Sequence, residues 1–367
     1  MDREVLLYYD KLNRTDAISL VTLGKETDDI DDDDNAEEAS QWEPPTLPSY
    51  ISIYVPLANI LIFLVGTIGN SMVIVVVARV RDMRSNINLY LVNLSVADLL
   101  VLLVCQPSAL LEFYAKERWF LGRELCLMVP VLEHTVVHAS ALTVVVITFE
   151  RYLAICRPHS RFRLSTNCGF SITILCIWIC ATLTSLPFLD MTSLDQSTFY
   201  DGSTCEVCRT VMTHKWHLYF VVVTTTGFSV LPVVLLACFY VPIICRLRAR
   251  QWTGEGSGRV SLGPIDSARG RYIQRSAALS SCGYRLRTHR QVIRMLILIV
   301  VFLFFSLVPM RAMVLWQTLG PPDVIANLGI ENYYNIIWIC RMLIFTNSAV
   351  NPLIYSLLST RFKIAFR

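Results

Sequence analysis

The sequence predicts an all-α membrane protein in which a bundle of seven helices crosses the bilayer. Three observations lead to this fold class. First, 54% of the 367 residues are hydrophobic and only 17% are charged, whereas ordinary soluble domains carry roughly 25% charged residues. Second, the chain contains several apolar runs long enough to span a bilayer. Third, its arginines are concentrated in every other connection between these runs.

The apolar runs each reach the length of about 20 residues that a transmembrane helix needs. Together they are expected to form one domain over residues 50–358. The runs lie at residues 51–78, 88–112, 124–153, 169–189, 216–245, 291–317 and 334–358.

The connections between the runs predict the topology of the chain in the membrane. Those after the first, third and fifth runs are rich in arginine, whereas the others hold few basic residues. Arginine-rich connections lie in the cytoplasm by the positive-inside rule, so the N-terminus is expected outside a plasma membrane and the C-terminus inside. Between membrane spans, basic segments indicate topology and contact with anionic membrane lipids. We therefore expect no nucleic-acid partner.

Two polar segments lie outside the predicted spans. Residues 1–49 are acidic and are expected to form a disordered extracellular arm. In this arm Asn13 begins an N-glycosylation sequon. Residues 247–288 are rich in glycine, serine and arginine, which predicts a flexible cytoplasmic loop.

Three cysteines are expected on the oxidising side of the membrane, where disulfides form. Cys126 lies at the outer start of the third run, and Cys205 and Cys208 lie before the fifth. A bridge from Cys126 would hold that connection over the mouth of the bundle, but spacing alone leaves its partner open. We favour Cys208, because only about eight residues then separate it from Trp216, where the fifth run begins.

Each run also carries polar or kinking residues that a simple lipid anchor does not need. The most distinctive segments are "NLSVAD", which ends at Asp98, "ERY" at residues 150–152 and "TNSAVNPLIY" at residues 346–355. A charged side chain within a membrane span is costly and usually functional. Three residues are therefore candidate functional residues: Asp98 in the second run, and Glu150 and Arg151, which are neighbours in the third run.

These segments in this order resemble the rhodopsin-like (class A) G-protein-coupled receptors over roughly residues 51–366. The resemblance implies a receptor that activates a heterotrimeric G-protein. In that family the neighbouring acid holds the triplet arginine at rest, and two tyrosines approach the arginine on activation. The final segment, residues 359–367, resembles the start of a short cytoplasmic amphipathic helix. The implied coupling residues are Glu150, Arg151, Tyr152, Tyr240, Asn351, Pro352 and Tyr355.

The resemblance also implies an allosteric sodium ion at mid-membrane, where a lone carboxylate needs a cation or a proton. We expect no other cofactor and no further metal. The sequence lacks the common catalytic motifs of nucleotide, metallopeptidase and serine-hydrolase sites, so we expect no enzyme and no catalytic residues. The sodium ligands would be Asp98, Ser140, Asn347 and Asn351.

The sequence departs from the family pattern at four positions. Leu307 stands where the family usually has a tryptophan in the sixth span, and Leu303 replaces the family's aromatic residue one turn earlier. His289 and Arg290 stand where an acid sometimes locks the triplet arginine.

The predicted ligand pocket contains charges of both signs. Glu133 stands at the level where aminergic receptors bind an amine, but Arg311 and Arg341 are expected to face the same pocket. One acid among two bases suits a carbonyl-rich, amidated or acidic ligand better than an amine. Glu133 can equally be the internal counter-ion of one arginine. His134 is expected to line the pocket rather than bind a metal.

Within the family, residues 133–158 and 340–367 most resemble the neuropeptide receptors of the thyrotropin-releasing hormone, ghrelin and neuromedin group. This implies an extracellular peptide ligand and coupling to phospholipase C and calcium release. Phe345 stands where a retinal pigment needs a lysine, which excludes an opsin. The alternatives are a receptor for a lipid or small acidic ligand, and a transporter. A transporter would show inverted repeats and broken half-helices, which we do not find in the sequence.

Overall fold

The structure is a computed structural model. It describes residues 48–115, 118–157, 167–198, 204–256, 268–319 and 328–366. The glycosylation sequon at Asn13 and almost all of the acidic arm lie outside these residues.

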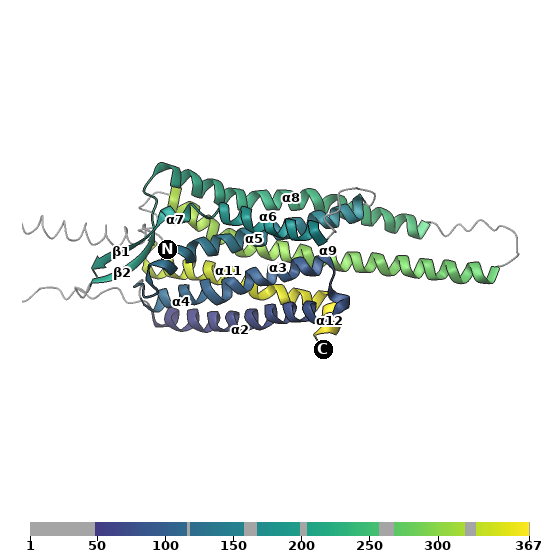
Figure 1. Cartoon of the computed structure of the whole chain (residues 1–367), viewed down its shortest axis with the longest axis horizontal. Coiled ribbons are helices and arrows are strands. Elements are labelled where there is room, and N and C mark those ends of the chain that lie inside the picture. The colour runs from purple at the N-terminus through teal and green to yellow at the C-terminus, as the bar shows by residue number, and fades with distance from the viewer. Residues whose placement is uncertain are drawn as a thin grey trace, which may run out of the picture.

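Among the described residues, seven helical segments are long and apolar enough to cross a membrane, which confirms the predicted bundle (Figure 1). The second span is built from two helices, α3 and α4, and the fourth continues from α6 into the short helix α7. A 3₁₀ turn, Arg81–Met83, joins the first span to the second. The bounds are α2 Ser49–Arg79, α3 Asn86–Leu100, α4 Gln106–Tyr114, α5 Gly122–Cys156, α6 Asn167–Leu183, α7 Phe188–Met191, α8 Lys215–Gly256, α9 Ala268–Leu319 and α11 Ile330–Leu358.

One turn of π-helix, Val101–Cys105, joins α3 to α4. The backbone N–H of Gln106 bonds to the carbonyl of Val101, five residues back. Pro107 follows directly, and a proline ring clashes with the carbonyl four residues before it in a regular helix. A wider turn relieves this clash, and such turns are frequent at functional sites. The sequence-based prediction of one continuous helix missed this turn.

A β-hairpin lies at one end of the bundle, between α7 and α8 (Figure 1). Its antiparallel strands are β1, Thr192–Thr198, and β2, Thr204–Thr210. The backbone N–H of Val211 donates to the carbonyl of Met191 at 2.5 Å and closes the base of the hairpin. We call this end of the bundle the mouth end and the opposite end the far end. No strand was expected from the sequence.

Two glycines let α2 approach the rest of the bundle closely. A Cβ on Gly69 would lie 2.9 Å from Cβ of Pro352 on α11, and a Cβ on Gly66 would lie 2.6 Å from a side chain of α3–α4. Asn70 uses this proximity, since its side-chain amide donates to the carbonyls of Gly66 and Ser348, both at 2.9 Å. Small residues at such contacts are the usual means by which membrane helices pack.

At the far end, α8 and α9 continue beyond the other helices (Figure 1). They extend into the segment 247–288, for which a flexible loop was predicted, and leave residues 257–267 outside the described chain. The difference has a physical reason, because residues 268–290 are rich in alanine and arginine, which are strong helix formers.

The chain ends in α12, Thr360–Ala365, as the sequence predicted for a C-terminal helix. The hydroxyl of Ser359 caps this helix by accepting from the backbone N–H of Phe362 at 3.5 Å. Phe362 is buried, and its ring lies 5.8 Å from the ring of Tyr355 on α11. The contact fixes α12 against the far end of the bundle.

Candidate functional site

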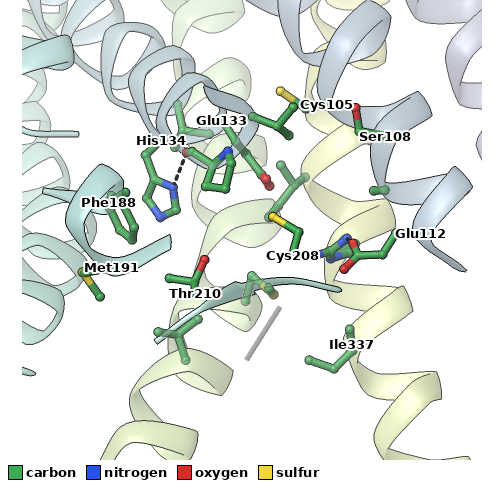
Figure 2. Close-up of a pocket in the computed structure, with 18 of the residues that line it drawn as sticks. Cys105, Ser108, Glu112, Glu133, His134, Phe188, Met191, Cys208, Thr210 and Ile337 are labelled. Carbon is green, nitrogen blue, oxygen red and sulfur yellow. Dashed lines mark hydrogen bonds and ion pairs between the residues drawn. The ribbon is translucent and has the colours of Figure 1, made fainter. Parts of the chain in front are cut away.

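A cavity of about 180 Å³ opens at the mouth end, below the hairpin (Figure 2). A single water molecule needs only about 10–15 Å³, so this space can hold several groups of a ligand. Residues of α4, α5, α8, α9 and α11 form its walls, and Cys208 and Thr210 of β2 lie across it. All four pocket residues predicted from the sequence line it: Glu133, His134, Arg311 and Arg341.

A second acid, Glu112 on α4, also lines the cavity and was not predicted. Its carboxylate lies 3.7 Å from a guanidinium nitrogen of Arg341, and both side chains are largely buried. Figure 2 shows Glu112 and Glu133 at separate places in the cavity lining. The expectation of one acid among two bases was therefore wrong. The described lining holds two acids and two bases, and its formal charge is balanced.

The second base, Arg311, has Glu133 as its electrostatic partner. No ion pair within 4.0 Å joins the two side chains among the described residues, so Glu133 acts on Arg311 from a greater distance than Glu112 acts on Arg341. Arg341 depends instead on Glu112 and on the ring of Trp338, whose centroid lies 5.6 Å from the guanidinium carbon. Its Nε is buried and has no hydrogen-bond partner among the described residues. Arg341 therefore keeps a donor that its present neighbours do not use.

Two histidines on α5 occupy different surroundings. His134 lines the cavity, donates from Nδ1 to the carbonyl of Pro130 at 2.9 Å, and packs on Phe188, with 3.7 Å between ring centroids. His138 lies one turn deeper and is fully buried. Its ring stacks on Phe228 at 3.6 Å, and Nδ1 is 3.1 Å from the hydroxyl of Thr184. These contacts make His138 a packing residue that joins α5 to α6 and α8.

The hairpin is fixed to the bundle by a disulfide between Cys126 on α5 and Cys208 on β2, the pairing favoured from the sequence. Cys205 remains a free thiol, and its sulfur lies 3.6 Å from the carbonyl of Ser197 on the facing strand. In the hairpin register Cys208 faces Leu194. The disulfide therefore holds β2 in place over the cavity.

Below the cavity, the residues predicted to hold sodium are all buried. The amide of Asn351 donates to a carboxylate oxygen of Asp98 at 2.9 Å, which brings α11 to α3. Ser140 and Asn347 are buried on α5 and α11, and the structure shows no hydrogen bond from either to Asp98 in the part that it describes. Of the predicted set, only Asp98 and Asn351 are in direct contact.

At the far end, the predicted coupling residues surround a buried apolar cluster. Tyr240 on α8 and Tyr355 on α11 both belong to this cluster, and the ring of Tyr152 lies 5.5 Å from that of Phe239. Pro352 lies on α11, one turn before Tyr355. The Tyr355 hydroxyl is fully buried and has no partner among the described residues.

Glu150 and Arg151 do not form the direct ion pair that the family resemblance implied. No contact within 4.0 Å joins them among the described residues, although Glu150 is buried and Arg151 is the charge that acts on it. Adjacent residues on an α-helix point in directions about 100° apart, so their side chains diverge. The Nε of Arg151 is buried and has no hydrogen-bond partner in the described chain.

Sequence reasoning missed Glu112 because it was counted only as the last residue of an apolar run. A usable signal was present, since Glu112 lies five residues after Pro107, near the end of the second span, where a charge is more easily accommodated. The π-turn before Pro107 could not be read from the pattern. It changes the face that the rest of the span presents to its neighbours.

Known proteins are similar to this sequence over most of its length. A profile of the family described as 7 transmembrane receptor (rhodopsin family) matches residues 69–355. The chain is 32% identical to neuromedin-U receptor 1 of Mus musculus, over 87% of this chain and 74% of that protein. It is 29% identical to the thyrotropin-releasing hormone receptor of Gallus gallus, over 85% and 77%. It is also 28% identical to the allatostatin-A receptor of Bombyx mori, over 88% and 80%.

Proposed function

The chain belongs to the rhodopsin family of seven-transmembrane receptors, and on this premise we propose that it binds a small extracellular peptide and activates a heterotrimeric G-protein. It is a class A receptor of the neuropeptide type, a multi-pass plasma-membrane protein and not an enzyme. The peptide would bind at the mouth end, and the G-protein at the far end.

The charged cavity is the observation that carries the ligand proposal. A peptide offers backbone carbonyls and N–H groups that suit a pocket of balanced charge better than a ligand of one sign does. The unused Nε of Arg341 is the donor we assign to a ligand carbonyl. A planar guanidinium can hold such a group while it keeps its contact with Glu112.

A contact at the mouth end argues against a lipid that enters from the bilayer. The hydroxyl of Tyr50 on α2 donates to Glu331 on α11 at 2.6 Å, and that of Tyr54 donates to Asn335 at 2.8 Å. The Asn335 amide also donates to the Tyr50 oxygen at 2.6 Å. These bonds tie the first span to the seventh beside the cavity, so the hairpin side is the open route.

The proposed orientation rests on the arginines of the far end. Exposed basic side chains lie there in three places: at the end of α2, in the turn that follows it and in the far-end part of α8. They are Arg79, Arg81, Arg84, Arg246 and Arg248. Positive residues of this kind face the cytoplasm. An epitope tag at the N-terminus should therefore bind antibody on intact cells, whereas a tag at the C-terminus should need permeabilised cells.

The coupling proposal uses the far end and the relatives together. Arg151 and the tyrosines of the buried cluster are the groups that a G-protein would engage when the bundle opens. The relatives include the neuromedin-U and thyrotropin-releasing hormone receptors, on which we base the proposal of phospholipase C coupling and calcium release. Asp98 is the residue we assign to an allosteric sodium ion in the resting receptor.

A calcium-release screen tests the proposed function. Cells expressing the receptor are exposed to a library of amidated neuropeptides, and the responding peptide is titrated on two variants. Arg341→Lys keeps the charge but loses the planar fork, and we expect potency to fall about 10- to 100-fold, the value of a charge-assisted hydrogen bond. Arg123→Lys, at an exposed arginine outside the cavity lining, is the matched control. A library without any active peptide, or equal potency for both variants, would contradict the peptide assignment.

A further inference from the structure

Thr148 on α5 contacts Tyr240 on α8 at the far end of the bundle. Its hydroxyl oxygen lies 3.3 Å from the Tyr240 hydroxyl and 2.9 Å from the carbonyl of Val144 in its own helix. Thr148 is fully buried, and Tyr240 is 8% exposed. No other hydrogen bond reaches the Tyr240 hydroxyl in the part of the chain that the structure describes.

This contact belongs to a closed arrangement of the far end. Tyr240 lies in one buried cluster with Leu296 of α9 and Tyr355 of α11, and these two side chains are fully buried. The neighbouring residues on the two helices are also close together, because the ring centroids of Phe149 on α5 and Phe239 on α8 lie 5.4 Å apart. A G-protein segment could enter here only after these side chains separate.

The helix that carries Tyr240 has a weak point beside it. Pro242 lies inside α8, two residues further along. Because proline has no N–H, the carbonyl of Cys238 loses its helix bond, and the backbone on either side of Tyr240 can bend at small cost. The side-chain contact to Thr148 is therefore an important restraint on the position of Tyr240.

We propose that the Thr148 hydroxyl is a latch that holds Tyr240 in the resting position and so limits activation without agonist. The proposal rests on the proposed G-protein coupling. Without the Thr148 hydroxyl, the Tyr240 hydroxyl is buried and unpaired in the closed state, which costs free energy. In an opened state it can reach water or Arg151, so loss of the latch shifts the population toward the open state. Thr148 is thus a positioning residue that acts through Tyr240.

Basal nucleotide exchange on the G-protein is the first measurement. Thr148→Val removes the hydroxyl at nearly constant shape, and we expect basal exchange to rise about twofold to tenfold, the equivalent of one net hydrogen bond. Thr148→Ser keeps a hydroxyl and should stay near the wild-type rate. Thr224→Val is the matched control, because among the described residues Thr224 on α8 bonds only within its own helix, to the carbonyls of Phe220 and Val221.

Hydrogen–deuterium exchange of α8 residues 236–246 is the second measurement, on receptor in lipid nanodiscs without G-protein. Thr148→Val and Tyr240→Phe should each speed exchange about twofold to tenfold. The double variant should be no faster than either, because both remove the same bond. Two results would overturn the latch. One is unchanged hydrogen–deuterium exchange in Thr148→Val. The other is that Thr148→Val speeds this exchange as much in the Tyr240→Phe background as in the wild type. If hydrogen–deuterium exchange behaves as expected but no condition activates a G-protein, the proposal of G-protein coupling fails, whereas the restraint of Tyr240 by Thr148 is retained.

Discussion

The ion pair between Glu112 and Arg341 should contribute to the stability of the empty receptor, and this can be tested without a ligand. The perturbation is a cycle of three variants: Glu112→Gln, Arg341→Gln and both together. Each single change leaves one charge in a largely buried site, with side-chain exposures of 15% for Glu112 and 12% for Arg341. The double variant leaves two neutral amides of similar shape.

The separation of the charges gives the expected size of the effect. At 3.7 Å, Coulomb attraction with an effective dielectric constant of 20 amounts to about 4.5 kcal/mol, and in bulk water to about 1.1 kcal/mol. The cost of removing both charges from water offsets part of this gain. We therefore expect each single variant to lose about 1–3 kcal/mol. The coupling between the two positions should be of the same size.

Thermal unfolding of purified receptor in detergent measures this cycle. A loss of 1 kcal/mol lowers the midpoint by roughly 2–4 °C in domains of 150–250 residues, so the midpoint of each single variant should fall by about 2–12 °C. The double variant should be closer to wild type than the sum of the single effects. Glu124→Gln, at an exposed acid near the start of α5, is the matched control and should leave the midpoint unchanged. Strict additivity of the two single effects would refute the ion pair.

Three further predictions concern other parts of the bundle. Arg151→Ala should leave surface expression and peptide binding nearly intact but abolish G-protein activation; full signalling at matched expression would exclude Arg151 from coupling. Sodium should weaken agonist affinity relative to choline buffer in wild type but not in Asp98→Asn, because coupling between two ligands is reciprocal; equal wild-type affinities would mean that Asp98 holds a proton instead. Gly69→Ala should lower the unfolding midpoint, because its new Cβ would lie 2.9 Å from the rigid ring of Pro352. Gly227→Ala is the control, since its new Cβ meets no atom within 4 Å and the change should be neutral or stabilising. A lower midpoint for Gly227→Ala than for Gly69→Ala would show that α2 can move away from α11.

The helices could be predicted because the bilayer imposes a length and an apolar composition on every span. Most predicted and observed ends differ by a few residues, as at α5, predicted from 124 and observed from Gly122. The exceptions are the far ends of α8 and α9, which extend to Gly256 and begin at Ala268. The contact of Asp98 with Asn351 follows the same logic, because a carboxylate in that setting must find a polar partner. The bilayer thus requires a polar partner for Asp98, whereas the choice of Asn351 was implied by the family resemblance.

Contacts that depend on local backbone geometry could not be predicted in the same way. The hairpin strands consist mainly of short polar residues, as in "TSLDQST", so hydropathy carries no signal for them. The partner of Arg341 depends on a π-turn that no periodicity reveals. The separation of Glu150 and Arg151 agrees with helix geometry, which directs adjacent side chains about 100° apart, but long side chains can still meet across that angle and the sequence does not decide between the two arrangements.

The geometry of α9 shows where Leu307, which replaces the family's usual tryptophan, lies relative to the cavity and to the bend of the helix. Leu307 and Arg311 both line the cavity, and Pro309 lies between them inside the helix. Because Pro309 has no N–H, the carbonyl of Phe305 lacks its helix bond and the helix can bend at this level. A ligand group that contacts Leu307 and Arg311 therefore touches both sides of the bend. The smaller side chain of Leu307 removes an aromatic contact from the cavity lining, whereas Pro309 still leaves α9 free to bend at this level.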